Sequence, residues 1–351
     1  MENQNQTPHK RRVRYKGKYP KKFEEKYKEL QPEKYKDTIE HVIQKGNTPA
    51  GMHISIMVKE ILDFLNIQPG ETGFDATLGY GGHTKAMLQC LNGKGHIYAT
   101  DVDPEESAKT KKRLAEQGFG EELLTVKLQN FCTIDEIAKE VGGFDFILAD
   151  LGVSSMQIDN PKRGFSFKTD GPLDLRLNQE TGISAARRLD TISREELAGM
   201  LCENSDEPYC EELAKAITDE IRRGNHIDTT TKLRQVIEKT LDFLPEKEKK
   251  ETIKKTCQRT FQALRIDVNH EFEVLYEFME KLPDALRPGG RVAILTFHSG
   301  EDRIVKQALK EGYREGIYSD YAKDVIRPSA QECAQNGRAR STKMRWAVRA
   351  E

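Results

Sequence analysis

The sequence lacks the long apolar segments that membrane insertion and secretion require. It contains no run of eighteen apolar residues, and its N-terminal region is rich in lysine and arginine without a hydrophobic stretch of the secretory type. Its six cysteines are scattered with no C-x-x-C pair, so the sequence suggests neither a zinc site nor a disulfide framework. We therefore expect a cytoplasmic protein with reduced thiols, no membrane partner and no metal.

A large net charge is absent as well. The 56 Lys and Arg residues nearly balance the 57 Asp and Glu residues, which leaves a formal charge of −1, so any surface for nucleic acid must be local. Residues 1–50 are basic, with tyrosines interleaved, and predict a flexible arm that is either a solubilising tail or a tether for RNA phosphates. A second basic cluster, which includes Arg338 and Arg340, has a strand-like pattern. It would be a phosphate track or an exposed sheet edge kept soluble by charge.

Alternating strand-like and helix-like segments predict an α/β protein with a mostly parallel sheet. The strand-like runs are 72–78, 96–101, 123–128, 144–150 and 291–297. The interval between the last two is far longer than one crossover needs, and it contains helical patterns at 207–223 and 231–244. We expect one domain formed by residues 51–155 and 256–351, with a helical substrate-recognition domain inserted at 156–255.

The most informative segment is the glycine turn at residues 79–83, which follows the first strand and precedes a helix. Glycines there let the backbone approach a ligand, and the helix start favours negative charge. The turn is not the G-x-G-x-x-G of dehydrogenases, and Asp101 ends the next strand about twenty residues later, where an acid typically binds ribose hydroxyls. An adenosine site without a diphosphate cradle favours S-adenosylmethionine over NAD.

Asp150 ends the fourth strand, beside the expected cofactor crevice. A carboxylate there could orient an amine toward the methyl donor, which is positioning more than proton abstraction. The structural alternative is that Asp150 caps the helix that follows.

Several later residues are candidates for substrate contact, each with a structural alternative. Arg163 and Phe165 could bind a phosphate and a base, or they could pack inside the loop. His298 follows the fifth strand, and Arg265 lies on the helical segment before it. Because no second histidine or carboxylate at ligand spacing accompanies His298, the sequence gives no support for a metal there.

Taken together, these segments resemble the bacterial 16S ribosomal RNA cytosine-N4 methyltransferases, the RsmH (MraW) family. The resemblance runs from about His53 to Arg345, and its motifs are His53 and Ser55 with Glu60, Asp75-Ala76-Thr77 with Gly81-Gly82-His83, Asp101 with Asp103-Pro104, Asn130-Phe131, Asp150 to Gln157, Arg163 to Phe167, Gly171 to Asp174, Thr260 to Ile266, Phe297 to Ser299, and Arg338 to Ser341.

The resemblance implies a class I S-adenosylmethionine-dependent methyltransferase, Rossmann-like, that methylates a cytidine in the decoding region of 16S rRNA in the small ribosomal subunit. It implies that the cofactor contacts are Gly81, Gly82, His83, Asp101, Phe131, Asp150 and Gln157. Departures from the family pattern, such as Gly300 where a leucine is usual, affect the insert and the RNA-facing parts more than the glycine turn. A methyltransferase with another acceptor, a non-catalytic ribosome-associated factor, and the oligomeric state, a homodimer included, remain open at this point.

Overall fold

The computed structural model describes residues 55–351, which lie within one compact unit, His53–Glu351. The arm expected at residues 1–50 lies outside the described residues. A seven-stranded sheet has the order β3-β2-β1-β4-β5-β7-β6. The strands are β1 (Thr72–Asp75), β2 (His96–Asp101), β3 (Leu124–Leu128), β4 (Phe144–Asp150), β5 (Leu286–Thr296), β6 (Tyr318–Tyr321) and β7 (Lys343–Arg349).

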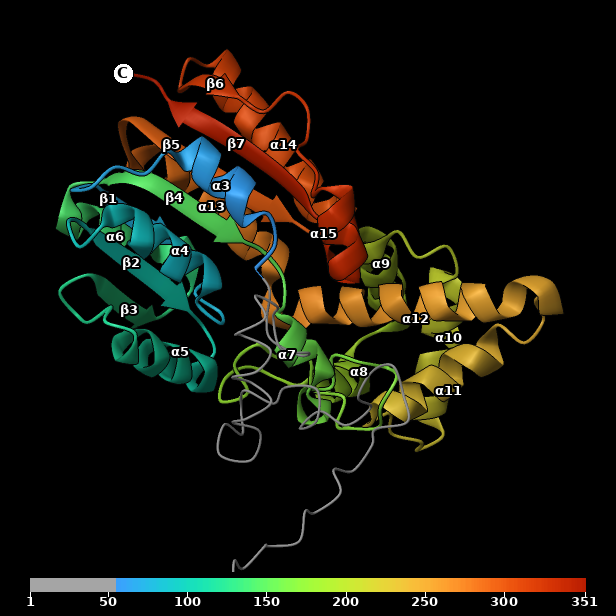
Figure 1. Cartoon of the computed structure of the whole chain (residues 1–351). Helices are drawn as coiled ribbons and strands as arrows, with labels where there is room; N and C mark the ends of the chain where they lie inside the picture. Colours follow the sequence, from blue (N-terminus) through green and yellow to red (C-terminus); the bar gives the residue numbers. More distant parts are fainter. Residues whose placement is uncertain (1–54) are drawn as a thin grey trace, which may run out of the picture. The chain divides into compact units, whose positions relative to one another are not determined.

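The sheet is parallel from β3 to β5, and β7 joins it antiparallel to both β5 and β6. Strand order reverses direction between β1 and β4, which is the position where open α/β sheets bind ligands. This mostly parallel sheet with helices on its faces confirms the predicted class I methyltransferase fold (Figure 1).

Helices cover both faces of the sheet, which explains why the central strands read as continuous apolar runs. One core cluster contains side chains of α6 (Ile134–Val141), α13 (Glu271–Ala285) and α14 (Ser299–Arg314). The other contains side chains of α3 (Val58–Leu65), α4 (Gly82–Leu91) and α5 (Pro104–Glu116). In β4, Ile147 faces the first cluster and Leu148 the second, as the strand period of two requires.

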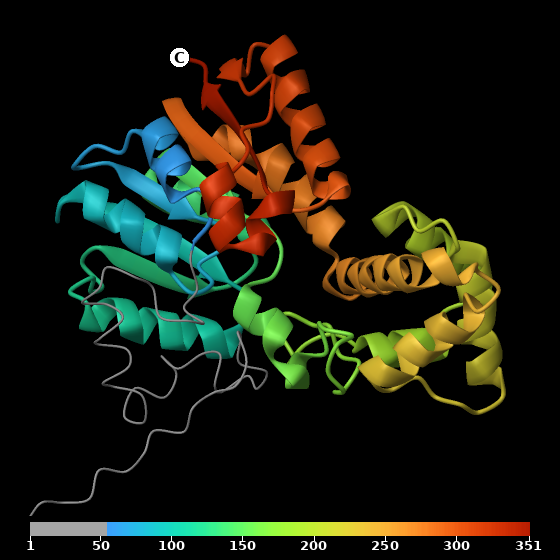
Figure 2. The ribbon, with the colours of Figure 1, turned by 45° about the vertical axis from the view of Figure 1, so that its right-hand side comes forward.

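The segment between β4 and β5 is helical and has a hydrophobic cluster of its own. Before α13, which packs on the sheet, it comprises α7 (Ser155–Asp159), α8 (Ala185–Thr191), α9 (Arg194–Ser205), α10 (Cys210–Arg222), α11 (Thr230–Thr240) and α12 (Glu246–Asn269). Figure 2 shows these helices gathered beyond the carboxyl ends of the strands. The boundary expected at residue 255 falls inside α12, because Cys257 and Phe261 pack in the helical cluster.

The prediction of a strand-like pattern for the C-terminal basic cluster is wrong for its first half. Residues Gly337–Ser341 form a 3₁₀ turn, which follows the short helix α15 (Ala330–Gln335) and begins where the side chain of Asn336 accepts a hydrogen bond from the N–H of Arg338. The strand that follows is not an edge, since β7 lies between β5 and β6. Arg345 of this strand is buried against Asp302, with Nε 2.7 Å from Oδ1.

None of the helices within residues 55–351 has the length and apolar character needed to span a bilayer.

Two glycines provide a matched test of the packing. A Cβ on Gly73 in β1 would lie 2.1 Å from ring atoms of the buried Phe146, whereas a Cβ on Gly199 in α9 would meet no atom within 4 Å. We expect Gly73→Ala to lower the free energy of unfolding by about 1–3 kcal/mol through overpacking. Gly199→Ala should raise it by about 0.5–1 kcal/mol through helix propensity. Urea denaturation of both variants measures the difference, and equal effects would contradict the packing described here.

Candidate active site

A cavity of about 370 Å³ opens where the carboxyl ends of the parallel strands meet α7 and the C-terminal half of α12. All seven residues that the resemblance implied as cofactor contacts line it, namely Gly81, Gly82, His83, Asp101, Phe131, Asp150 and Gln157. Arg265, His298 and Arg338 line the same cavity. The fold therefore brings together residues that are far apart in the sequence.

The glycine turn is built by backbone constraints as well as by space for a ligand. Gly79 and Gly81 have φ angles of 47° and 78°, in the left-handed region that favours glycine. A Cβ on Gly81 would lie 2.7 Å from Thr110, and one on Gly82 would lie 2.0 Å from the hydroxyl of Ser55. These two glycines therefore allow close packing of protein atoms around the start of α4.

Asp101 is held in a fixed orientation at the end of β2. The N–H of Gly79 donates to Oδ2 (2.8 Å), and the N–H of Asp103 donates to Oδ1 (2.9 Å). Burial raises the pKa of Asp101 from 3.8 to about 6, although these backbone hydrogen bonds act in the opposite direction. No cation among residues 55–351 pairs with Asp101. Hydroxyl donors of a ligand would therefore stabilise the ionised form of this acceptor.

Phe131 and Gln157 form the neighbouring walls. Phe131, in a short 3₁₀ helix at Phe131–Thr133, packs edge-on against Phe278 with ring centroids 5.1 Å apart. The side chain of Gln157 is occupied by protein contacts, because its Oε1 accepts from the N–H of Ser154 and its Nε2 donates to Asp103. Phe131 therefore offers an apolar ring to the cavity, whereas Gln157 mainly fixes the position of α7.

His83 and Asp150 are linked across the ends of α4 and β4. Nε2 of His83 lies 2.9 Å from the carbonyl oxygen of Ile56, and Nδ1 lies 3.3 Å from Oδ2 of Asp150. Because both partners are acceptors, this arrangement favours a proton on each ring nitrogen. Burial alone would lower the pKa of His83, but the hydrogen bond and charge of Asp150 outweigh it and raise this pKa.

The other oxygen of Asp150 is available for a ligand. Oδ1 is buried and has no hydrogen-bond partner among residues 55–351. The alternative that Asp150 caps the next helix is wrong, since Ser154 is the N-cap of α7. Asp150 therefore presents one unpaired carboxylate oxygen at the end of β4.

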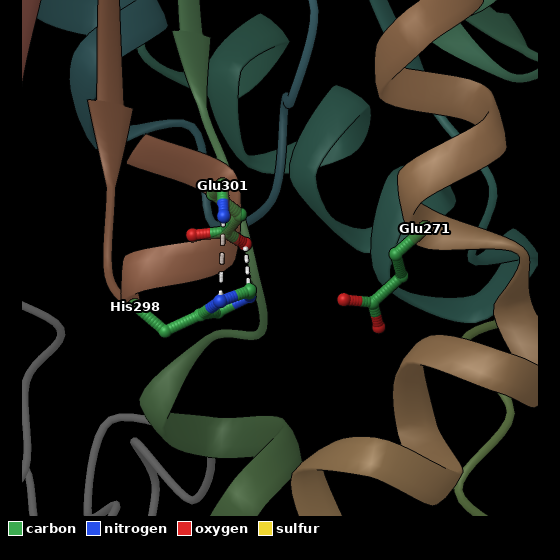
Figure 3. A group of neighbouring side chains, drawn as sticks. All are labelled: Glu271, His298 and Glu301. Carbon is green, nitrogen blue, oxygen red and sulfur yellow. Dashed lines mark hydrogen bonds and ion pairs between the residues drawn. The ribbon is translucent and has the colours of Figure 1, made fainter. Parts of the chain in front are cut away.

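His298 is accompanied by two carboxylates, which the sequence pattern failed to indicate. Ligand atoms of Glu271, His298 and Glu301 lie within 4.8 Å of one another (Figure 3). Both oxygens of Glu271 already accept hydrogen bonds from Arg265, each at 2.8 Å. This pairing balances the charge of Glu271 by a protein cation. Glu271 was missed because only the packing of α12, α13 and α14 brings it near His298.

The candidate substrate residues separate into three groups. Arg163 and Phe165 are buried and do not line the cavity, and the Arg163 guanidinium lies 2.8 Å from Oδ2 of Asp103. These contacts favour the alternative that both residues pack inside the protein and do not bind a phosphate and a base. Arg338 lines the cavity but pairs with Asp159 through two contacts of 3.0 and 3.1 Å. Arg340 is exposed and does not line the cavity.

The cavity fits S-adenosylmethionine in the chemistry of its lining. An oriented acid suits the ribose, the Phe131 ring suits an adenine, and Asp150 brings an unpaired oxygen to the same cavity. When bound, this cofactor supplies an electrophilic methyl group on a positively charged sulfur.

We expect Asp101→Ala to weaken S-adenosylmethionine binding by about 10- to 100-fold, because it removes a charge-assisted hydrogen bond of roughly 1.5–3 kcal/mol. Isothermal titration calorimetry measures this change. Asp284→Ala, which alters an exposed carboxylate on α13, is the control. An unchanged dissociation constant for Asp101→Ala would refute the ribose assignment.

The pKa of about 6 also predicts a pH dependence of binding. In the free protein, the pKa of this carboxyl is higher in the folded state than in the unfolded state. The group therefore adds to the free energy of unfolding below its unfolded-state pKa, and this contribution is lost as pH rises through the folded-state pKa. Ribose hydroxyls favour the ionised form, so cofactor affinity should be constant above pH 6 and fall by up to about tenfold per pH unit below it. Asp101→Asn should remove most of this dependence, and a wild-type affinity that stays flat down to pH 5 would contradict it.

Comparisons with known proteins identify the family of this chain. A family model described as the MraW methylase family matches residues 50–350. The chain is 86% identical over 343 residues to ribosomal RNA small subunit methyltransferase H 1 of Agathobacter rectalis, covering 98% of each protein. It is 71% identical over 348 residues to the protein of the same name from Lachnoclostridium phytofermentans, covering 99% of this chain and 95% of that one.

The crystal structure of an rRNA methylase from Streptococcus thermophilus is 14% identical, covers 86% of this chain and 100% of that one, and has a TM-score of 0.38, too low to support an argument. The family and relatives together show that this chain belongs to the MraW methylase family of S-adenosylmethionine-dependent methyltransferases.

Proposed function

We propose that this methyltransferase transfers the methyl group to the exocyclic N4 of a cytidine in the decoding region of 16S rRNA, within the small ribosomal subunit of the cytoplasm. The names of its relatives support ribosomal RNA as the substrate class. The observation that carries the choice of an amine is the buried, unpaired Oδ1 of Asp150 in the cofactor cavity. An ionised acceptor is suited to a group with N–H bonds and unsuited to a carbonyl.

Asp150 positions the amine. By accepting a hydrogen bond from one N–H, Oδ1 would orient the amine nitrogen so that its lone pair faces the methyl group. His83 holds the second oxygen, with Nδ1 3.3 Å from Oδ2, and so fixes the orientation of the carboxylate during this contact. The amine nitrogen loses a proton after it gains the methyl group, so orientation and not prior deprotonation is the main task of Asp150.

The helical segment between β4 and β5 supplies the surface that we assign to RNA. At the end where α11 and α12 meet, Phe243 is 66% exposed, and Lys250, Lys254 and Lys255 are exposed on α12. Exposed lysines and an exposed aromatic ring suit a single-stranded nucleic acid. The lysines would contact phosphates, and the ring would stack on a nucleobase. Because Lys254 and Lys255 also pair with Glu251, a purely solvated helix face is the competing interpretation.

Nucleoside mass spectrometry of small-subunit rRNA tests the function. Cells without this gene should lack one N4-methylated cytidine, and expression of the wild-type chain should restore it. Asp150→Asn should restore little of it, since we expect kcat to fall by about 100-fold or more when a positioned ionic group is lost. The matched control is Asp284→Asn on the exposed surface of α13, which should restore it fully.

The same experiment distinguishes the other candidates. A methyl group that appears on another RNA site, on protein or on a metabolite identifies a different acceptor. A chain that binds rRNA in a salt-dependent way but transfers no methyl group in a single turnover would be a non-catalytic ribosome-associated factor. Either result contradicts the proposed function.

A further inference from the structure

Two buried polar atoms of opposite character lie in residues that line one cavity, and neither makes a hydrogen bond within the described part of the chain. They are Oδ1 of Asp150, an acceptor, and Nε2 of His298, and neither has a hydrogen-bond partner among residues 55–351. Both residues line the cavity. They also stand at the ends of neighbouring parallel strands, because Asp150 pairs with Leu295 of β5, three residues before His298. A ligand that reaches one of these side chains is therefore brought close to the other.

Local hydrogen bonding indicates which nitrogen of His298 carries the proton. His298 is the N-cap of α14, and its Nδ1 accepts from the N–H of Glu301 at 3.4 Å. A ring nitrogen that accepts carries no proton, so the neutral imidazole has its proton on Nε2. His298 thus presents a donor.

Glu301 favours this arrangement. Its Oε1 lies 3.1 Å from Nε2 of His298 without satisfying it as a hydrogen bond, and its Oε2 accepts from the N–H of Phe297 (Figure 3). Burial by itself raises the pKa of Glu301, but His298 and Arg265 outweigh burial and lower it. A carboxylate beside Nε2 attracts a proton to that nitrogen and leaves its N–H free to bind a second acceptor.

We propose that His298 donates a hydrogen bond from Nε2 to the ring nitrogen adjacent to the amine that is methylated, while Asp150 accepts from the amine itself. This inference rests on the proposed function and deepens it. Cytosine places the acceptor N3 beside its N4 amine, and adenine shares this chemistry in N1 and the N6 amine. Uracil presents a carbonyl beside a ring N–H, which opposes both protein groups, and so does the O6 and N1–H edge of guanine.

Both protein groups contribute to selectivity because each is buried. A base with the correct pattern satisfies the donor and the acceptor, whereas a base with the wrong pattern leaves them unpaired in a site with little water. Sites built in this way reject analogues that lack one partner more strongly than apolar pockets do. His298 is therefore assigned a role in reading the base.

Binding of nucleotides to the complex with S-adenosylhomocysteine tests this role without relying on turnover. Affinities for cytidine monophosphate and its 3-deaza analogue, which replaces N3 by C–H, are measured by ligand-observed NMR. Every buffer contains EDTA, so that nucleotide binding through a cation held by Glu271, His298 and Glu301 is prevented. We expect the wild-type protein to prefer the natural nucleotide by about tenfold.

His298→Ser is the matched variant. Serine is a strong N-cap, so α14 keeps its cap while the Nε2 donor is lost. This variant should bind both nucleotides equally, at the level of the deaza analogue, with its affinity for S-adenosylhomocysteine unchanged as the check on folding. His298→Asn, which provides both a cap oxygen and an amide N–H, should recover part of the preference.

The outcomes separate this proposal from the proposed function. Equal wild-type affinity for the two cytidine nucleotides, undetectable binding included, overturns the role of His298, and so does an undiminished preference in His298→Ser. Neither result affects methyl transfer to 16S rRNA as measured in cells. Conversely, a His298-dependent preference for adenosine monophosphate over its 1-deaza analogue, with none for cytidine, supports the role of His298 and contradicts cytidine as the acceptor.

Discussion

The site depends on the contact between His83 and Asp150. The glycine turn sets the start of α4, and the first turn of that helix carries His83. The carbonyl of Ile56 on one side and the carboxylate of Asp150 on the other require both ring nitrogens to be donors. Because His83 fixes one oxygen of Asp150, the other oxygen is left without a hydrogen bond within residues 55–351 and can accept one from a ligand. Removal of either partner would leave a buried charge uncompensated, which is far costlier than loss of a surface pair.

The acids in and beside the cavity differ in the cations that lie next to them. Asp150 is paired with His83, and Glu271 is paired with Arg265. Asp103 is paired with Arg163, which also donates to the carbonyl of Leu177 and so ties the cofactor side of the cavity to the helical segment. Asp101 has only backbone N–H donors, and its pKa is raised accordingly. The acid without a cation is the one whose ionised form gains most when ribose hydroxyls arrive.

Local patterns in the sequence were sufficient for the five parallel strands of the sheet. The strands 96–101 and 144–150 are found with the same bounds, because apolar runs buried on both faces are a strong signal. The division into two domains stays a prediction, since α12 crosses the expected boundary without interruption. Contacts between distant segments could not be read from local pattern. Arg163 looked like a phosphate ligand, and only the fold shows that Asp103 neutralises it.

Gly300 shows how a departure from the family pattern is absorbed beside the proposed base-reading residue. A Cβ at this position would lie 2.5 Å from Cζ of Phe272 and 3.2 Å from Nδ1 of His298, so the leucine expected from the resemblance would not fit here. The Phe272 ring takes that space, and its centroid lies 5.8 Å from that of His298. An aromatic ring from α13 thus packs beside the imidazole where a side chain at residue 300 of α14 would lie. The change alters which element supplies the packing and leaves the N-cap contact of His298 with Glu301 in place. A single unusual glycine at this site is therefore explained by compensation and does not indicate loss of the site.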